Sequence, residues 1–224
     1  MKRMLVTAGS TATHIDKVRV VTNIFGGRTG EHIALKAAEA GWQVMLLSSN
    51  PGGESPRPEW VLERRRFKTF DELAELMEIE VREGGYDAIV HSAAVSDYRP
   101  AGAYVLGPDG RPVPLATEGP DAAKIPSSHN ELFIKLVPTF KIVDRIRKPW
   151  GFKGKLVKFK LQVGMTDERL IEIARRSIVQ SDADLIVANC LEWSQVRAYV
   201  IDRNGGGASV HRVDLPYELL RRLS

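Results

Sequence analysis

Short apolar runs alternate with amphipathic segments along the chain, and this alternation constrains the fold more than any other feature. Apolar runs at residues 3–7, 42–49 and 88–90 are separated by helical patterns at residues 30–40 and 71–82. The runs lack the strict polar–apolar alternation of a sheet with one solvated face, so both faces should be covered. The pattern predicts an α/β fold, a Rossmann-like, mostly parallel sheet flanked by helices.

The second half continues the pattern and adds a hairpin. Residues 156–161 and 184–188 read as buried strands, with a helix predicted over residues 166–180 between them. Residues 197–213 predict a hairpin that turns at a glycine-rich stretch, and a last helix is expected from Pro216. We expect residues 1–224 to form a single domain.

The middle of the chain breaks this order. Residues 99–123 are rich in proline and glycine, and a long loop inside a compact domain is usually functional or disordered. Val105 and Val113 could pair across the turn sequence at residues 108–110. The sequence therefore predicts a flap or hairpin segment, at about residues 99–130, after the third main strand.

Composition excludes several classes of function. The 224 residues carry a formal charge of +4, and the basic residues are scattered among 28 acidic ones, which favours small anionic ligands over nucleic acid. The arginine runs at residues 64–66, 175–176 and 221–222 are expected on solvated helix faces. The single cysteine, Cys190, indicates a reducing compartment. No stretch approaches the ~20 apolar residues of a membrane helix, so we expect no membrane partner and a cytoplasmic location.

A glycine-rich stretch opens the first predicted helix. Gly27 and Gly30 would let the backbone approach a ligand, and the free amides of a helix start favour a phosphate. The stretch contains neither the dinucleotide fingerprint nor a Walker A loop, and a tight turn without a ligand explains it equally well. Just upstream, Arg19 could clamp a phosphate or carboxylate, or simply pair with Asp16.

Two further segments carry polar groups. Residues 91–100 begin as a buried strand and end in small and polar residues, where open α/β sheets bind ligands. Asp97 there could accept a hydrogen bond from a sugar or base, or cap a turn. Lys124 follows the long loop and could reach into a site to neutralise phosphate charge, or remain exposed to solvent.

Together these segments, in this order, resemble the phosphopantothenoylcysteine synthetase family, most closely the stand-alone bacterial type. The motifs that carry the resemblance are Thr7-Ala8-Gly9, Val18-Arg19, Asn23 with Gly27 and Gly30, Ala94-Val95-Ser96-Asp97-Tyr98-Arg99-Pro100, Lys124 to Ser128, Phe159-Lys160-Leu161, and Asp184 to Asn189.

The resemblance implies a two-step ligation in coenzyme A biosynthesis. The carboxylate of 4′-phosphopantothenate would attack the α-phosphate of CTP, or of ATP, and the amine of cysteine would then attack the acyl-nucleotidylate. It also implies Mg²⁺, a homodimer whose flap completes the neighbouring site, and a separate phosphopantothenoylcysteine decarboxylase as the pathway neighbour.

The resemblance assigns roles to individual residues. Asn23 would hold the acyl intermediate, and Lys124 would be required to make it. The substrate- and nucleotide-binding positions would be Gly9, Arg19, Gly27, Gly30, Ala94, Asp97, Phe159 and Asn189. The metal ligands are not assigned.

Two other functions remain open from the sequence. An NAD(P)-dependent Rossmann-type reductase would share the strand–helix–strand start, although the chain contains no Tyr-x-x-x-Lys pair. A catalytically inactive nucleotide-binding relative is the other alternative. Phe25-Gly26 favours it, because many bacterial members have hydroxyl side chains there, and so does Cys190, which stands where aspartate is common.

Overall fold

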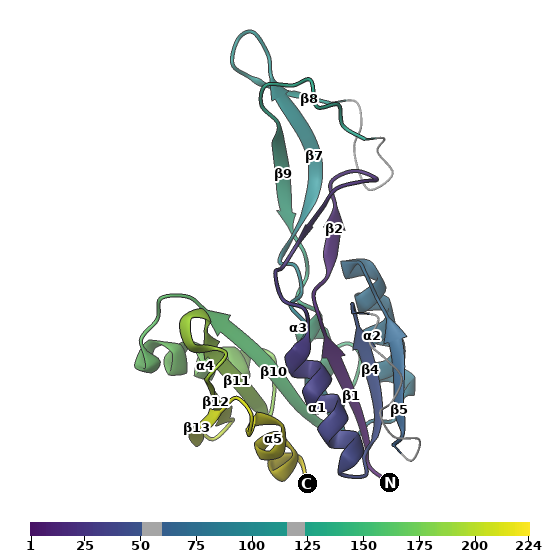
Figure 1. The fold of residues 1–224 in the computed structure, drawn as a ribbon, viewed down its shortest axis with the longest axis vertical. Coiled ribbons are helices and arrows are strands. Elements are labelled where there is room, and N and C mark those ends of the chain that lie inside the picture. Colours follow the sequence, from purple (N-terminus) through teal and green to yellow (C-terminus); the bar gives the residue numbers. More distant parts are fainter. Residues whose placement is uncertain (51–59, 116–123) are drawn as a thin grey trace.

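The computed structural model describes residues 1–50, 60–115 and 124–224, and its body is built on one eight-stranded sheet (Figure 1). The strand order across the sheet is β13-β12-β11-β10-β6-β1-β4-β5. The six strands from β11 to β5 run parallel, and β12 and β13 are antiparallel. The strands are β1 (Arg3–Ala8), β4 (Gln43–Ser48), β5 (Leu62–Arg66), β6 (Ala88–His91), β10 (Lys155–Gln162), β11 (Leu185–Cys190), β12 (Arg197–Asp202) and β13 (Gly207–His211). The predicted α/β fold is confirmed.

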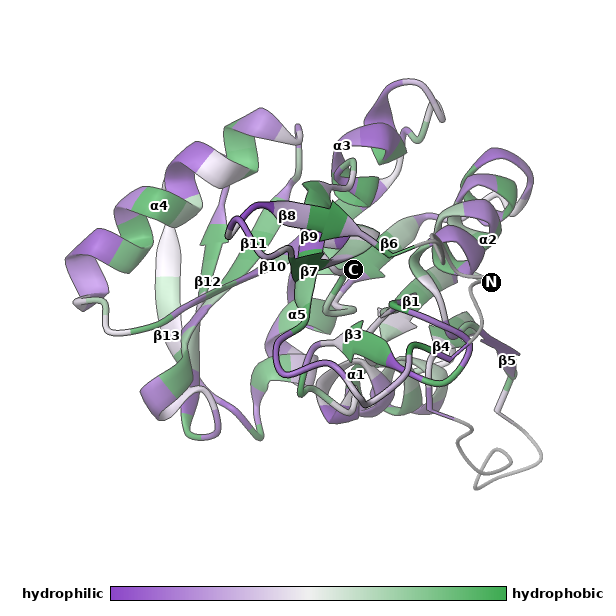
Figure 2. Cartoon of the chain, turned by 90° about the horizontal axis from the view of Figure 1, so that it is seen from above, coloured by the Kyte–Doolittle hydropathy of each residue, from purple (hydrophilic) through white to green (hydrophobic). Residues whose placement is uncertain are grey.

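Helices cover both faces of the sheet. Seen from above, α1 and α5 lie on one side, and α2, α3 and α4 lie on the other (Figure 2). The helices are α1 (Arg28–Glu39), α2 (Phe70–Glu83), α3 (Ile142–Arg147), α4 (Asp167–Gln180) and α5 (Leu215–Leu223), and a 3₁₀ turn, η1 (Leu191–Trp193), follows β11. No helix in the described ranges is long and apolar enough to cross a membrane.

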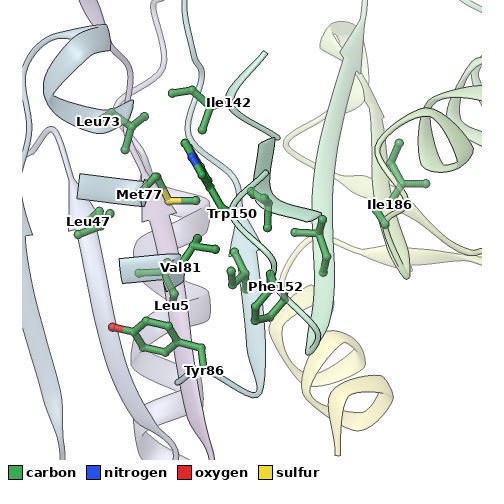
Figure 3. Close-up of a cluster of buried hydrophobic side chains, with 14 of the residues drawn as sticks. Leu5, Leu47, Leu73, Met77, Val81, Tyr86, Ile142, Trp150, Phe152 and Ile186 are labelled. Carbon is green, nitrogen blue, oxygen red and sulfur yellow. The ribbon is translucent and has the colours of Figure 1, made fainter. Parts of the chain in front are cut away.

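The two-sided core follows from the alternation of side chains along each strand. On β1, Leu5 packs against the α2 side, where Leu73 and Met77 are fully buried (Figure 3). Met4 and Val6 pack against the α1 side. Fully burying one such side chain stabilises the fold by about 1.5–3 kcal/mol. The apolar runs of the parallel strands are therefore explained by cover on both faces.

The prediction for residues 64–66 was wrong. These arginines lie on β5, the edge strand that pairs in parallel with β4, and not on a helix. Arg64 forms an ion pair with Glu31 of α1 at 2.5 Å, and Arg65 forms one with Glu80 of α2 at 2.9 Å. An edge strand can carry this charge because its arginine side chains reach acidic residues on the flanking helices α1 and α2. β5 ends at Arg66, directly before the buried Phe67.

A long arm rises from the body (Figure 1). It contains β7 (Tyr98–Leu106), β8 (Pro112–Pro114) and β9 (Phe133–Pro138), and the hairpin of β2 (Ala12–His14) and β3 (Val20–Thr22) lies beside its base. Val105 pairs with Val113, as predicted. The arm contains more strand than the expected loop, and a register shift between Pro100 and Ala103 accommodates the proline in β7. The part of the predicted flap at residues 116–123 lies outside the described residues.

The order of the strands creates a crevice. From β1 the chain proceeds outward to β4 and β5, and then returns to the other side of β1 for β6, β10 and β11. At such a switch point the connections leave in opposite directions, which opens a crevice at the carboxyl ends of the strands. β6 ends at His91, earlier than predicted, because the chain then turns over the end of β1, where the Ala94 amide donates to the Gly9 carbonyl at 2.8 Å.

Candidate active site

A cleft of about 740 Å³ lies at this switch point. Its walls come from the loops after β1 and β6, the first turns of α1 and α3, the carboxyl half of β10, and the end of β11. Segments far apart in the sequence therefore share one cavity.

The start of α1 forms one wall of the cleft. Gly27 is the N-cap residue, with φ of 85°, and a methyl group there would lie 2.3 Å from the Gly9 backbone nitrogen. Gly30 is equally tight, because a methyl group would lie 2.5 Å from the Ser92 hydroxyl. The helix ladder begins at Glu31, so the earlier amides have no partner within the helix and favour an anion.

Asn23 is held in position by the loop after β6. Its side-chain Nδ2 donates to the Ala94 carbonyl at 3.0 Å, and Ala94 is in turn tied to Gly9. The other Nδ2 proton and the Oδ1 atom remain available for a ligand. Both Asn23 and Ala94 line the cleft.

Asp97 and Lys141 form an ion pair where the arm joins the body. Both side chains line the cleft, and the Thr139 amide donates to the Asp97 carbonyl at 2.9 Å. An exposed pair of this kind contributes little to stability, so both charges are available to a ligand at small cost.

Arg212 is a cleft residue that the sequence analysis missed. Its guanidinium donates to Asn189 Oδ1 at 3.2 Å and to the hydroxyl of Thr29 in the first turn of α1. Burial lowers the pKa of Arg212, but a guanidinium stays charged, so a cation stands beside the free helix amides. Nothing in the local sequence marks it, because its partner Thr29 is 183 residues away.

Lys158 and His91 lie side by side in the floor of the cleft, paired in register on β10 and β6. Burial lowers the pKa of His91 to about 4, with Lys158 adding to the effect, so the imidazole is neutral at pH 7. Its Nδ1 contacts the Thr7 hydroxyl at 3.0 Å. Burial also lowers the pKa of Lys158, to about 8.

The cleft lysines were missed although the sequence held a signal. Lys158 and Lys160 interrupt a parallel strand that is covered on both faces, where charged side chains are rare. Phe159 between them was predicted from the family motif, and all three line the cleft.

Two predicted residues lie elsewhere. Arg19 pairs with buried Asp16 at 2.9 Å and donates to the Ile125 carbonyl at 3.2 Å, so the expected ion pair is present, and a binding role for Arg19 stays a prediction. Lys124 is exposed next to Ile125, which contacts the turn between β2 and β3. Neither lines the cleft.

The remaining predicted residues are brought together. The set that lines the cleft is Gly9, Asn23, Gly27, Gly30, Ala94, Asp97, Phe159 and Asn189. Their individual roles remain predictions. Within residues 1–50, 60–115 and 124–224, no three His, Cys, Asp or Glu side chains gather closely enough to hold a metal ion.

The chain is similar to several known proteins. A protein of Thermococcus kodakarensis named coenzyme A biosynthesis bifunctional protein CoaBC is 36% identical over 193 residues, which are 85% of this chain and 42% of that protein. The protein of the same name from Methanocaldococcus jannaschii is 25% identical over 84% of this chain and 40% of that protein. The chain thus spans about two-fifths of the length of these curated relatives.

Solved structures share its fold. A DNA/pantothenate metabolism flavoprotein from Streptococcus pneumoniae superposes with a TM-score of 0.83 at 28% identity, covering 100% of this chain and 98% of that one. A Cab2 mutant in complex with phosphopantothenate-cysteine superposes with a TM-score of 0.72, covering 99% of this chain and 86% of that one; at 18% identity this likeness shows the fold alone.

The family model described as the DNA/pantothenate metabolism flavoprotein C-terminal domain, DFP, matches residues 1–105. This range contains β1, the glycine-bounded start of α1, and the loop after β6, which together build half of the cleft. Residues 1–105 are therefore similar to the DFP family model, that of the C-terminal domain of the DNA/pantothenate metabolism flavoproteins.

Proposed function

We propose that the chain joins 4′-phosphopantothenate to cysteine at the expense of a nucleoside triphosphate, as a phosphopantothenate–cysteine ligase of coenzyme A biosynthesis. The names of its relatives support this activity. The observation that carries the proposal is the meeting of Asn23, Asp97, Phe159 and Asn189, from four separate motifs, in one cleft beside free helix amides.

The first step needs charge stabilisation and positioning. The carboxylate of phosphopantothenate would attack the α-phosphorus of the nucleotide, forming an acyl-phosphate bond while the bond to pyrophosphate breaks. The free amides between Gly27 and Glu31 and the guanidinium of Arg212 stand where phosphate charge would gather. We assign Lys124 to this step as well, reaching the cleft from the arm of a partner subunit.

The second step forms the amide. The cysteine amine would attack the activated carbonyl and expel the nucleoside monophosphate, with one proton leaving the amine. Asn23 can donate its second Nδ2 proton to the acyl or phosphate oxygen, because its first proton is already bonded to Ala94. This anchored geometry holds the donor at a fixed place through the reaction.

CTP is our first choice of nucleotide, on the family resemblance, and ATP is the alternative. We also propose that Mg²⁺ enters with the nucleotide and offsets phosphate charge. The donor set fits that mode: Asp97 and Asp144 line the cleft as separate carboxylates, and magnesium is commonly bound by one or two carboxylates together with substrate phosphates.

We further propose a cytoplasmic homodimer whose product is used by a phosphopantothenoylcysteine decarboxylase. Support for the dimer comes from the arm, which exposes large apolar side chains at Leu106, Val113, Phe133 and Leu136. Exposed apolar patches on an extended element are typical of association surfaces.

A pyrophosphate-release assay tests the function. The wild-type protein, given phosphopantothenate, cysteine and Mg²⁺, should release pyrophosphate and form the amide with CTP, and less efficiently with ATP. If the protein releases no pyrophosphate with either CTP or ATP, the proposal is refuted and an inactive relative is favoured. If it binds NADPH instead, the reductase alternative is favoured.

Variants separate the two steps. Asn23→Ala should retain pyrophosphate release but slow amide formation by about 10²-fold, the usual effect of losing one such donor. Lys124→Gln should abolish release. Asn204→Ala, in the exposed turn between β12 and β13, is the matched control and should behave as wild type. Normal amide formation by Asn23→Ala would remove Asn23 from the mechanism.

A further inference from the structure

Lys158 is a buried lysine without a carboxylate partner. Its side chain is only 7% exposed, in the middle of β10, between α3 and α4. The ammonium donates to the Ser177 carbonyl at 3.1 Å and to the Ser181 hydroxyl at 2.6 Å, both on the α4 side. In the described part of the chain it forms no ion pair, and its third proton has no partner. A buried ammonium in this condition is costly to the fold and indicates a function.

The groups that face Lys158 make the region positively charged. Lys160 follows it on β10, Lys141 lies at the start of α3, and both disfavour its charged form. Asp144 of α3 is the one acidic group that favours the charged form, and its carboxylate also accepts from Gln180 of α4 at 3.2 Å. The neighbouring His91 of β6 is neutral at pH 7. Because Lys141 is also paired with Asp97, three lysines share two carboxylates, and the region keeps a net positive charge.

This region is continuous with the rest of the cleft. Lys141, Lys158 and Lys160 line the same cavity as Asn23 and Gly27. In the proposed reaction, the amides at the start of α1 bind one phosphate, and Asn23 binds the acyl group. The lysines stand at the α3–α4 end of the cavity, beside Asp97 and Asp144, where the proposed chemistry has so far placed only Mg²⁺.

We infer that the α3–α4 end of the cleft is an oligophosphate subsite, built on Lys158 with Lys141 and Lys160, that binds the β- and γ-phosphates of the nucleotide and the pyrophosphate that leaves. The inference rests on the proposed function for the identity of the ligand. A nucleobase is neutral and a carboxylate carries a single charge, so neither matches three converging ammonium groups. A pyrophosphate group, with several negative charges and many acceptor oxygens, does match them.

Direct binding tests the subsite without requiring catalysis. Titration calorimetry would measure the affinities of wild type and Lys158→Met for inorganic pyrophosphate, CTP and CMP. The methionine removes the charge and keeps the apolar stem. We expect at least a tenfold loss of affinity for pyrophosphate and CTP, and less than a twofold change for CMP. Lys158→Arg should restore most of the lost affinity, and Lys153→Met, on the exposed loop before β10, should match wild type.

Proton uptake gives a second readout. Because the pKa of Lys158 is about 8 in the free protein, a bound anion should raise it. At pH 8.5, calorimetry in buffers of different ionisation enthalpy should then show more protons taken up with pyrophosphate by wild type than by Lys158→Met. A purely structural lysine would leave this difference at zero.

Three outcomes would overturn the inference: an unchanged pyrophosphate affinity in a folded Lys158→Met, equal losses for CTP and CMP, or equal proton uptake. Thermal melting of each variant establishes that it is folded. A wild-type protein that binds pyrophosphate through Lys158 but forms no amide would refute the proposed ligase and leave the subsite standing.

Discussion

Gly26 and Gly27 are neighbours in sequence with opposite structural demands. Gly27 has φ of 85°, and a methyl group there would meet the Gly9 backbone. At Gly26 no atom lies within 4 Å of such a methyl group, and the backbone has no positive φ. The pair therefore offers a matched test of whether the tight start of α1 is needed.

Gly27→Ala should lower the free energy of unfolding by at least about 2 kcal/mol, because a left-handed residue with a Cβ costs 1–2 kcal/mol before the clash is counted. It should also weaken nucleotide binding, since the amides of the first turn would shift. Gly26→Ala should change both quantities little. Urea unfolding and nucleotide titration measure them, and equal effects of the two substitutions would show that the contact with Gly9 is unimportant.

At the scale of elements, Asp16 ties the β2–β3 hairpin to the segment that carries Lys124. Its fully buried carboxylate accepts from the amides of Val18 and Arg19 at 2.8 Å, and from the Ile125 amide at 3.1 Å. Burial acts to raise the pKa of Asp16, but the backbone hydrogen bonds and the Arg19 charge outweigh it, so the pKa is lowered. The clamp is thus strongest with the carboxylate ionised.

Asp16→Asn should loosen this clamp, because the amide nitrogen that replaces one oxygen would face donors instead of accepting from them. Hydrogen exchange should show a protection factor at the Ile125 amide reduced about tenfold or more, with the sheet amides unchanged. Asp109→Asn, in the turn at the far end of β7, is the control. Unchanged protection at Ile125 would contradict the clamp.

The same clamp predicts a dependence on pH. A lowered pKa in the folded state means that the stabilisation is present above the usual value of 3.8 and is lost as the pH falls through the folded value. In wild type, protection at Ile125 should therefore decline only in acid, below about pH 4, whereas in Asp16→Asn it should not follow this titration.

The order of strands and helices could be read from the sequence, because periodicity reports local burial. The buried runs of β1, β4 and β11 and the helix after Thr166 were predicted to within one or two residues. The arm was only partly foreseen, since its strands are exposed and contain proline, which hides the usual pattern. Arg212 could not be foreseen, because its contact with Thr29 joins residues 183 positions apart in the sequence.

At the scale of the whole molecule, the arm carries apolar surface outside the core. Leu136 on β9 and Val113 on β8 are each more than 40% exposed. If the arm is the dimer interface that we propose, its apolar side chains are buried in solution and carry most of the association energy.

Leu136→Asp should convert the dimer to a monomer, or raise its dissociation constant at least 100-fold, because a charge would have to be buried without a partner. Sedimentation velocity measures this. Val179→Asp, on the solvent face of α4 at 72% exposure, is the matched control and should remain dimeric. A wild-type protein that sediments as a monomer at all concentrations would refute the arm as an interface.

The chain enters and leaves the arm at almost the same point. The Thr139 hydroxyl donates to the Ser96 carbonyl at 2.7 Å, and the Thr139 amide donates to the Asp97 carbonyl. These two hydrogen bonds join the two ends of the arm where it meets the body. A short turn could therefore replace the arm without moving β6 or α3. Such a shortened protein would keep the cleft of the body but lose Lys124 and the proposed dimer surface, so one deletion would separate the geometry of the cleft from the proposed activity.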